Sequence, residues 1–435
     1  MNNQARNIEP HTADPNRVFI TGLSALTACG SNAETTWDTV ISGQSALSEI
    51  TQWDLSSWKY RLGGELQNFQ PAKMLPDRKL LKAISRQDVM GINAATQAVE
   101  LSGWLPYRDT LAPATLTTFN EETAIYVGSP GNKYYQQYDF LPLMSKTNNF
   151  QSFADGLFDE VHPMWLLRIL PNNVLAYTGI TYGFKGPNHN ITNHAVGGTQ
   201  ALLEAYAAIQ SGQAERAVVV AYDSLEPQSL FYYARLGVIS ERHLKPFDQS
   251  HDGTLLAEGA AAIVLESERS AKARSATCYA EMLGGGTASE SAGLFSINQE
   301  GTQLAQLMNR TLERLNLKTK DIDCLIAHGN GNPRSDNTEA QAVNQLFPHR
   351  PPVSAFKWAM GHTLCSSGVV DAVLTTYALR TRCLPGIANL DKIANECASL
   401  NLSADQQSLP PASRAMMVSR GFASMNACLI LQAVD

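Results

Sequence analysis

The stretch His189-Asn-Ile-Thr-Asn-His-Ala-Val-Gly-Gly198 runs directly into Thr199-Gln-Ala-Leu-Leu-Glu-Ala-Tyr-Ala-Ala-Ile-Gln210. We interpret it as a short strand, a sharp turn and a helix, which Gly212 ends. Apolar residues lie on more than one side of this helix, which predicts that it is buried. A turn before a buried helix holds its side chains near the positive end of the helix dipole, where enzymes place a thiolate or bind an anion. The residue at the apex of the predicted turn is Ala195, which has no reactive group.

The composition of the chain is that of an ordinary globular protein. Its 435 residues are 44% hydrophobic and 17% charged, which leaves room for a large core. The net charge of −7 argues against nucleic acid as the main partner. The seven cysteines form no C-x-x-C pair, so we expect free thiols in a reducing cytoplasm. Residues 1–16 are predicted to be a disordered tail without the apolar region of a signal peptide, and no apolar run reaches the 18 residues of a transmembrane helix.

Strand-like and helix-like segments alternate along the chain. Alternation of this kind indicates an α/β fold in which helices cover both faces of the sheets. The segment 133–168 is rich in aromatic residues and contains few clear strands, which favours a cap or an interface. Strands are predicted at 18–23, 122–128, 217–222, 260–266, 324–327, 415–419 and 427–432, and helices at 33–42, 82–101, 303–315 and 366–380.

Three further segments carry residues that suit catalysis. One places His328 before a glycine turn and two carboxylates, Asp336 and Glu339; the others are Lys357 to His362 and the small-residue loop 421–426. Each segment also has a purely structural interpretation. His328 would be a hydrogen-bonded histidine at a strand end, and Asp336 and Glu339 would face solvent on a helix. Lys357 would be an exposed charge, and the loop 421–426 would be an ordinary hairpin. Taken together, two histidines that end separate turns can converge to polarise a carbonyl or stabilise an enolate. A helix N-terminus and a loop with free N–H groups would complete an oxyanion site.

Metal and nucleotide sites have little support. His189 and His194 are five residues apart without an acidic ligand nearby, so no metal site is predicted. No GxGxxG follows a strand and no G-K-[ST] is present, so nucleotide binding is not expected either.

From residue 17 to 432 the chain resembles the β-ketoacyl-acyl-carrier-protein synthases of the thiolase fold. The resemblance rests on the opening strand 18–30, the segment 168–187 and the pattern Lys245-Pro-Phe-Asp248…Asp252-Gly253…Ala257-Glu-Gly-Ala260. It implies two similar halves, 17–266 and 267–435, with stacked mixed sheets in α-β-α-β-α layers. It also implies that His328 and His362 are the catalytic histidines, that Lys357 is the family lysine, that Asp336 and Glu339 fall on carboxylate positions, and that Phe422, Ala423 and Ser424 lie in the oxyanion and gate loop.

The chain departs from this family at the opening stretch. Ala195 stands where the family has its nucleophilic cysteine, so the usual acyl-enzyme cannot form. A substitute nucleophile would have to be Thr192, Thr199 or a displaced cysteine; Cys29 and Cys365 lie near other turns, and we expect neither to occupy a helix-initiating elbow. Asn330 and Asn332 replace the threonines that the family prefers, which would alter hydrogen bonding to a carrier arm.

Family members that lack the nucleophile are typically the silent subunit of a heterodimer, and the resemblance therefore favours a chain-length-factor-like protein. Its partners would be a cysteine-bearing ketosynthase and an acyl carrier protein, whose phosphopantetheine carries the substrate, so no cofactor of its own is expected. Its pathway would make polyketides, polyenes or unusual fatty acids. Tyr134, Tyr135 and Tyr138 are candidate side chains of a shared acyl tunnel, or an ordinary aromatic cluster.

Two other functions remain open. The first is a malonyl-carrier-protein decarboxylase that uses His328 and His362, and the second is an active synthase with a non-standard route. An acidic carrier protein needs a basic contact surface. Arg78, Lys79, Lys82 and Arg86 are candidates for it, although a solvated helix face is the simpler explanation.

Overall fold

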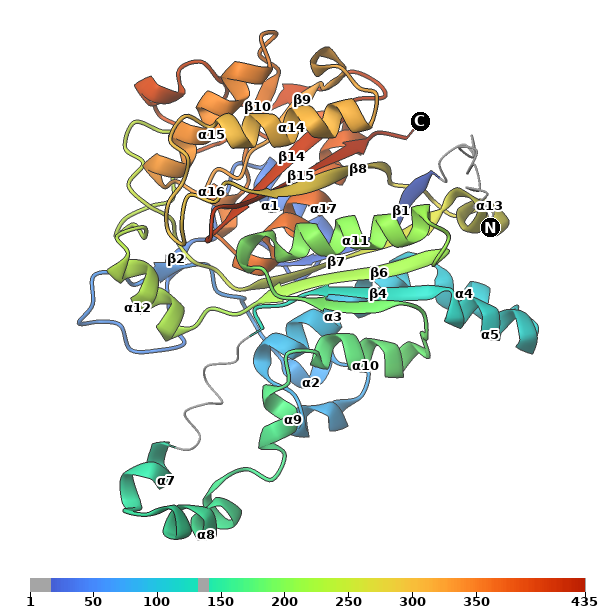
Figure 1. Ribbon diagram of the computed structural model, residues 1–435, viewed down its shortest axis with the longest axis vertical. Helices are drawn as coiled ribbons and strands as arrows, with labels where there is room; N and C mark the ends of the chain where they lie inside the picture. The colour runs from blue at the N-terminus through green and yellow to red at the C-terminus, as the bar shows by residue number, and fades with distance from the viewer. Residues whose placement is uncertain (1–16, 132–140, 435) are drawn as a thin grey trace, which may run out of the picture.

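The centre of the described protein is an 11-stranded mixed β-sheet that divides into two smaller sheets, joined edge to edge (Figure 1). The computed structural model describes residues 17–131 and 141–434. Within these ranges, hydrogen bonds connect the strands in the order β12-β10-β9-β14-β15-β8-β1-β7-β6-β4-β5. Their bounds are β1 (Val18–Leu26), β4 (Thr123–Gly128), β5 (Asn188–Ile191), β6 (Arg216–Asp223), β7 (Gly259–Ser267), β8 (Ala280–Ser289), β9 (Cys324–Ile326), β10 (Pro352–Ser354), β12 (Asn401–Leu402), β14 (Arg414–Gly421) and β15 (Met425–Gln432).

The two sheets meet where β1 pairs with β8. This pairing extends only over 18–20 and 280–282, whereas β1 follows β7 along almost its whole length. Two helices lie between the sheets. α11 (Gly197–Gln210) contacts β4 and β6 on one side and β8 and β15 on the other, and α17 (Ser367–Thr381) contacts β7 and β14. α3 (Arg86–Leu101) packs on β1, β6 and β7, while α14 (Thr302–Arg314) packs on β8, β15 and α15 (Pro333–Leu346). The predicted α-β-α-β-α layering is therefore confirmed.

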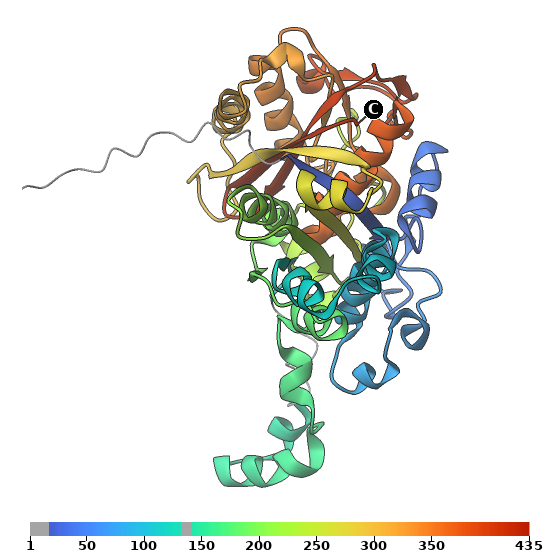
Figure 2. The same ribbon diagram turned by 90° about the vertical axis from the view of Figure 1, so that its right-hand side faces the viewer.

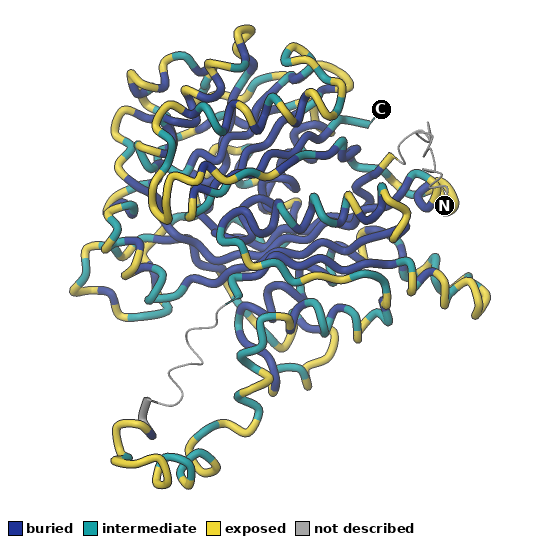
Figure 3. Tube along the Cα trace, viewed as in Figure 1, coloured by how far each residue is buried: buried dark blue, intermediate teal, exposed yellow. Residues whose placement is uncertain are grey.

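The central strands are apolar throughout because both of their faces are covered. In β6, Val219 belongs to the core cluster that contains α11, whereas Val218 and Val220 belong to the cluster that contains α3. Successive side chains of a strand point to opposite faces, so a strand between two helical layers needs apolar residues at every position. Figure 3 shows the result as a continuous buried centre.

Two sequence predictions differ from the structure. The helix predicted at 82–101 begins at Arg86, because Ser85 caps it and its backbone N–H donates to the Asp88 carboxylate at 2.9 Å. Residues 78–82 form a separate 3₁₀ turn. Strand β8 was not predicted, because three consecutive glycines weaken its pattern. A Cβ at Gly285 would lie 2.1 Å from the carbonyl oxygen of Cys428 on β15, so this close strand pairing requires glycine.

An arm of three helices extends from the body of the protein (Figures 1 and 2). It consists of α7 (Leu141–Lys146), α8 (Phe150–Glu160) and α9 (Trp165–Ile169), so the described part of the aromatic segment is helical. The large apolar side chains exposed on it are Met144, Phe150, Phe158, Leu166 and Leu167. Its role as an interface remains a prediction.

All seven cysteines are free thiols. Within residues 17–131 and 141–434, no helix is both long and apolar enough to cross a bilayer.

Candidate functional site

The opening stretch folds as predicted, into a strand, a tight turn and a buried helix. β5 leads into a single 3₁₀ turn (His194–Val196), and α11 follows directly and ends at Gln210, with Ser211 as its C-cap and Gly212 in the left-handed conformation. Ala195 is completely buried in this turn. The residue before it, His194, has φ +47°, a left-handed conformation that is costly for a residue other than glycine. The turn is thus a strained elbow whose apex bears a methyl group.

A second turn of the same kind opens α17. It is the 3₁₀ turn Leu364–Ser366, and Leu364 has φ +45°, close to the value for His194. Cys365 therefore occupies the position in this turn that Ala195 occupies in the first. The expectation that Cys365 lies outside a helix-initiating elbow was wrong, because the two halves of the fold repeat the same turn and the sequences share no visible repeat.

Cys365 is nevertheless unsuited to attack a substrate. It is completely buried, and burial together with the nearby Asp223 carboxyl raises the pKa of its thiol well above the ordinary value. A Cβ at Gly197 would lie 2.9 Å from its sulfur, so the thiol packs beneath the first turn. Among the other proposed substitutes, Thr199 is buried with its hydroxyl 2.7 Å from that of Ser419. Burial also raises the pKa of Cys29, to about 12.

His328 and His362 converge as predicted. Their ring centroids are 5.1 Å apart and the rings are nearly perpendicular. Both histidines are buried. Nδ1 of His328 accepts the backbone N–H of Arg420 at 3.4 Å, and Nδ1 of His362 accepts that of Leu364 at 3.3 Å. Because a backbone N–H can only donate, each neutral ring carries its proton on Nε2 and can donate it to a substrate oxygen.

Both imidazoles are held in the neutral form. Burial lowers the pKa of each well below the ordinary value, and the positive charge of Lys357 lowers both further. Lys357 is itself buried at the first position of α16 (Lys357–Met360), and its ammonium group donates to the Asp371 carboxylate at 2.8 Å. The interpretation of Lys357 as an exposed charge is therefore wrong.

Asp336 and Glu339 lie on α15 but face inward rather than toward solvent. Both are buried. The Glu339 carboxylate accepts the backbone N–H groups of His328 at 2.7 Å and Gly329 at 3.1 Å. Asp336 accepts the backbone N–H of Phe247 at 2.9 Å. These carboxylates hold the loops around the site in place, and Glu339 fixes the backbone of His328 itself.

The loop 421–426 connects β14 to β15 as a tight hairpin. Ala423 and Ser424 have φ values of +59° and +58°, where glycine would be free of strain. Phe422 packs against three rings, with centroids 4.5 Å from His194, 5.1 Å from Tyr233 and 5.3 Å from Phe295. The hairpin thereby brings the backbone of Phe422 directly against the first turn.

His194 joins the turn to this hairpin. Its ring lies almost parallel to that of Phe422, at 16°. Nδ1 accepts the backbone N–H of Phe422 at 3.3 Å, and Nε2 lies 2.8 Å from the hydroxyl of Tyr233 on α12 (Pro227–Arg235). Burial lowers the pKa of His194 to about 4, so the ring is neutral at pH 7. His189 points elsewhere and contacts Glu204, at 2.9 Å, so the two histidines of the opening stretch do not share a site.

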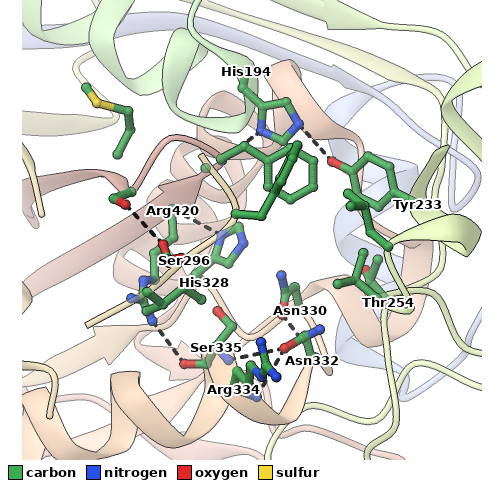
Figure 4. Close-up of a pocket in the computed structure, with 18 of the residues that line it drawn as sticks. His194, Tyr233, Thr254, Ser296, His328, Asn330, Asn332, Arg334, Ser335 and Arg420 are labelled. Carbon is green, nitrogen blue, oxygen red and sulfur yellow. Dashed lines mark hydrogen bonds between the residues drawn. The ribbon is translucent and has the colours of Figure 1, made fainter. Parts of the chain in front are cut away.

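A cavity of about 430 Å³ is lined by His194, Tyr233, His328, His362, Phe422 and Ser424, among others (Figure 4). His194 and Tyr233 lie at one side and His328 below them, while Asn330, Asn332 and Arg334 lie at the opposite side. Asn332 caps α15 by accepting the N–H of Arg334 at 3.1 Å, and the side chain of Asn330 accepts the N–H of Asn332 at 3.0 Å. Both asparagines therefore have local partners at the cavity wall.

Sequence reasoning missed the roles of three lining residues. These are His194, Tyr233 and Arg420, whose buried guanidinium pairs with Glu290 at 3.1 Å. The position of His194 next to Ala195 was the available signal. Tyr134, Tyr135 and Tyr138 lie outside the described residues. Within the described ranges, no three histidine, cysteine, aspartate or glutamate side chains are grouped to hold a metal ion.

Comparison with known proteins identifies the family. The model of the β-ketoacyl synthase N-terminal domain matches residues 15–271, and that of the C-terminal domain matches residues 279–391. The chain belongs to the β-ketoacyl synthase family. It is 26% identical over 442 residues to 3-oxoacyl-[acyl-carrier-protein] synthase 2 of Staphylococcus aureus, covering 96% of this chain and 98% of that protein.

Two solved structures share the whole fold of this ketosynthase-family chain. A β-ketoacyl synthase from Burkholderia phymatum superposes with a TM-score of 0.85 at 24% identity, covering 97% of this chain and all of the other. The ishigamide ketosynthase/chain length factor superposes with a TM-score of 0.84 at 23% identity and the same coverage. The predicted thiolase-like fold is confirmed.

Proposed function

We propose that this protein is a non-condensing, chain-length-factor-like subunit that pairs with a cysteine-bearing ketosynthase. The observation that carries the proposal is Ala195, a buried methyl group at the apex of an otherwise complete elbow. His328, His362 and Phe422 of the hairpin line the same cavity as His194, the residue next to Ala195, and Lys357 pairs with Asp371. An acyl-enzyme cannot form at Ala195 because this residue has no thiolate. Cys365, which holds the equivalent position in the second turn, has a thiol, but this thiol is buried and protonated.

Two surfaces support pairing with a second chain of the same fold. β5 pairs with β4 along one edge and has no strand on its other edge among the described residues. Its His189 is exposed. An open strand edge is a template for another strand. The arm α7–α9 adds exposed apolar side chains, including Phe150 and Phe158, which are costly to leave in water. A partner with the same arm and edge would cover both surfaces.

A relative acts on acyl-carrier-protein substrates, as its name states. We infer that the assembled complex receives acyl chains from an acyl carrier protein and that its synthase subunit performs the condensation. The pathway would be a polyketide, polyene or unusual fatty acid pathway in the cytoplasm, and this subunit would form part of the wall around the growing chain.

Co-expression with candidate synthases tests this proposal. An affinity tag on this chain should recover a cysteine-bearing ketosynthase in a 1:1 ratio. The matched control replaces Phe158 by Ser in the tagged chain, which should recover much less. A stable homodimer that no synthase joins would contradict the proposal.

A second candidate function is decarboxylation of malonyl-carrier protein, and the histidine pair is the observation that favours it. Both rings carry Nε2–H groups that can donate to the thioester oxygen of a malonyl group. The bond between the α-carbon and the carboxylate would break, its electrons would form the enolate, CO₂ would leave, and a proton from water would complete the acetyl thioester. Carbon dioxide release that His328→Ala and His362→Ala both abolish would support this function. Release that is absent, or unaffected by the substitutions, would exclude it.

A further inference from the structure

The backbone at His194 directs its side chain into the cavity without requiring an imidazole. Its φ of +47° belongs to the elbow, since Leu364 adopts φ +45° at the same place in the second turn. Leu364 shows that an apolar side chain satisfies this backbone equally well. The turn therefore does not require a histidine at position 194, and the imidazole can have a role in the cavity instead.

The imidazole of His194 lies against the hairpin backbone and uses its Phe422 amide. A Cβ at Gly421 would lie 3.3 Å from Nδ1 of His194 and 3.4 Å from the backbone nitrogen of Ala195. The N–H of Phe422 donates directly to Nδ1 at 3.3 Å. The hairpin backbone at Gly421 and Phe422 thus lies close to the turn at Ala195, and the imidazole of His194 takes up the Phe422 N–H.

The ring is held there from both sides. Tyr233 contacts Nε2 at 2.8 Å, and Phe422 lies parallel to the ring at 4.5 Å. Because Nδ1 accepts from Phe422, the proton is on Nε2, which donates to the hydroxyl of Tyr233. A substrate oxygen would have to displace a ring that has two hydrogen bonds and a stacked neighbour.

We propose that His194 determines the specificity of this site by excluding acyl thioesters, because its imidazole occupies the place where a thioester carbonyl oxygen would bind. The inference deepens the proposed non-condensing function and rests on it. It means that the site is closed twice: the nucleophile is absent at Ala195, and the Phe422 N–H is already used. The exclusion concerns a thioester oxygen bound at the Phe422 amide. The Nε2–H groups of His328 and His362 take no part in this contact and stay able to donate to the thioester oxygen of a malonyl group.

The chemistry that His194 blocks is acyl transfer. A thiolate at position 195 would attack the thioester carbon, its sulfur would bond to that carbon, and the carbonyl electrons would move onto oxygen. Collapse of this oxyanion would expel the carrier thiolate, which takes a proton. Loss of one oxyanion donor slows such a step by about 10²–10³-fold. A cysteine introduced beside an intact His194 should therefore be slow to acylate.

The test compares Ala195→Cys with Ala195→Cys/His194→Ala in the full-length protein. Each is incubated with S-octanoyl-pantetheine, and intact mass followed by peptide mapping reports octanoyl groups at residue 195. The wild type and His194→Ala alone show the background from the seven native cysteines. Ala195→Cys/Leu294→Ala is the matched control, because it widens the same cavity and leaves His194 in place.

The double variant without the imidazole should acylate at residue 195 at least ~100-fold faster than Ala195→Cys alone. The Leu294 control should behave like Ala195→Cys. Equal rates for Ala195→Cys and Ala195→Cys/His194→Ala would overturn the proposal, as would no acylation of either. Should His194→Ala not fold, His194→Gly accepts the left-handed backbone without strain and serves the same comparison. A protein that pairs with a synthase yet gives equal rates contradicts this inference alone.

Discussion

Lys357 and Asp371 form a buried ion pair at 2.8 Å, and their side chains are only 2% and 5% exposed. The pair ties α16 to α17. Its ammonium group contributes to the low pKa of both His328 and His362. The site therefore has an electrostatic arrangement that keeps two imidazoles neutral.

Breaking this pair from one side should be strongly destabilising. Lys357→Met leaves a buried carboxylate without its cation, which costs about 3–5 kcal/mol of unfolding free energy. The double variant Lys357→Met/Asp371→Leu should recover much of that loss, since both charges are removed together. Urea denaturation measures the difference. Lys272→Met breaks an exposed pair with Glu268 and should change stability by less than about 1 kcal/mol. A similar small effect at Lys357 would contradict the buried pair.

The titration of His194 gives a second prediction. Its folded pKa is about 4, whereas an unfolded histidine titrates near 6.5. As the pH falls from 6.5 toward 4, the unfolded chain takes up a proton here and the folded chain does not, so this residue makes stability fall with falling pH. Removing it should reduce the slope of unfolding free energy against pH by up to about 1.4 kcal/mol per pH unit in this window.

The measurement is a urea series from pH 7 to pH 4 on the wild type and His194→Ala. The comparison must be between two proteins, because burial raises the pKa of Asp223 to about 8 and of Glu339 to about 7, and these carboxyls titrate with the opposite sign. Tyr233→Phe keeps the imidazole and should keep the wild-type slope. An unchanged slope in His194→Ala would mean that burial does not lower the pKa of this ring in the folded protein.

The arm should matter for assembly and not for folding. Phe158 is 91% exposed and Phe150 is 83% exposed. Surface substitutions of this kind usually change stability by less than about 0.5 kcal/mol. Phe150→Ser/Phe158→Ser should therefore unfold like the wild type, yet bind a ketosynthase partner at least ~10-fold more weakly, since exposed aromatic anchors commonly carry binding energy. Leu101→Ser, on the end of α3, changes an exposed apolar residue away from the arm and should leave binding intact. Equal binding by all three proteins would place the interface elsewhere.

Much of the fold could be predicted from local patterns, because buried strands and helices have strong signatures. β6 and α11 could be recognised in the sequence because the faces that they bury in the core carry apolar residues. β8 was not, because its close pairing with β15 requires glycines that give no strand signal. The direction of Asp336 and Glu339 also escaped prediction. Their spacing on a helix is the same whether they face solvent or the backbone of the site.

The site itself was predictable only in part. The histidines and Ala195 stand out in the sequence, but the role of His194 depends on Phe422, which is 228 residues further along the chain. Cys365 was misjudged for a similar reason. Its equivalence to Ala195 comes from a turn that both halves of the fold repeat with different residues. The two turns therefore share backbone angles but not sequence.

The central claim is that this chain assists a condensing site and does not run one. The most direct measurement is the mass of each subunit after the reconstituted complex of this chain and its ketosynthase has been exposed to an acyl-acyl carrier protein. The account predicts one acyl group per heterodimer, carried entirely by the cysteine-bearing partner and lost when that cysteine is replaced by alanine. An acyl group on this chain would contradict it.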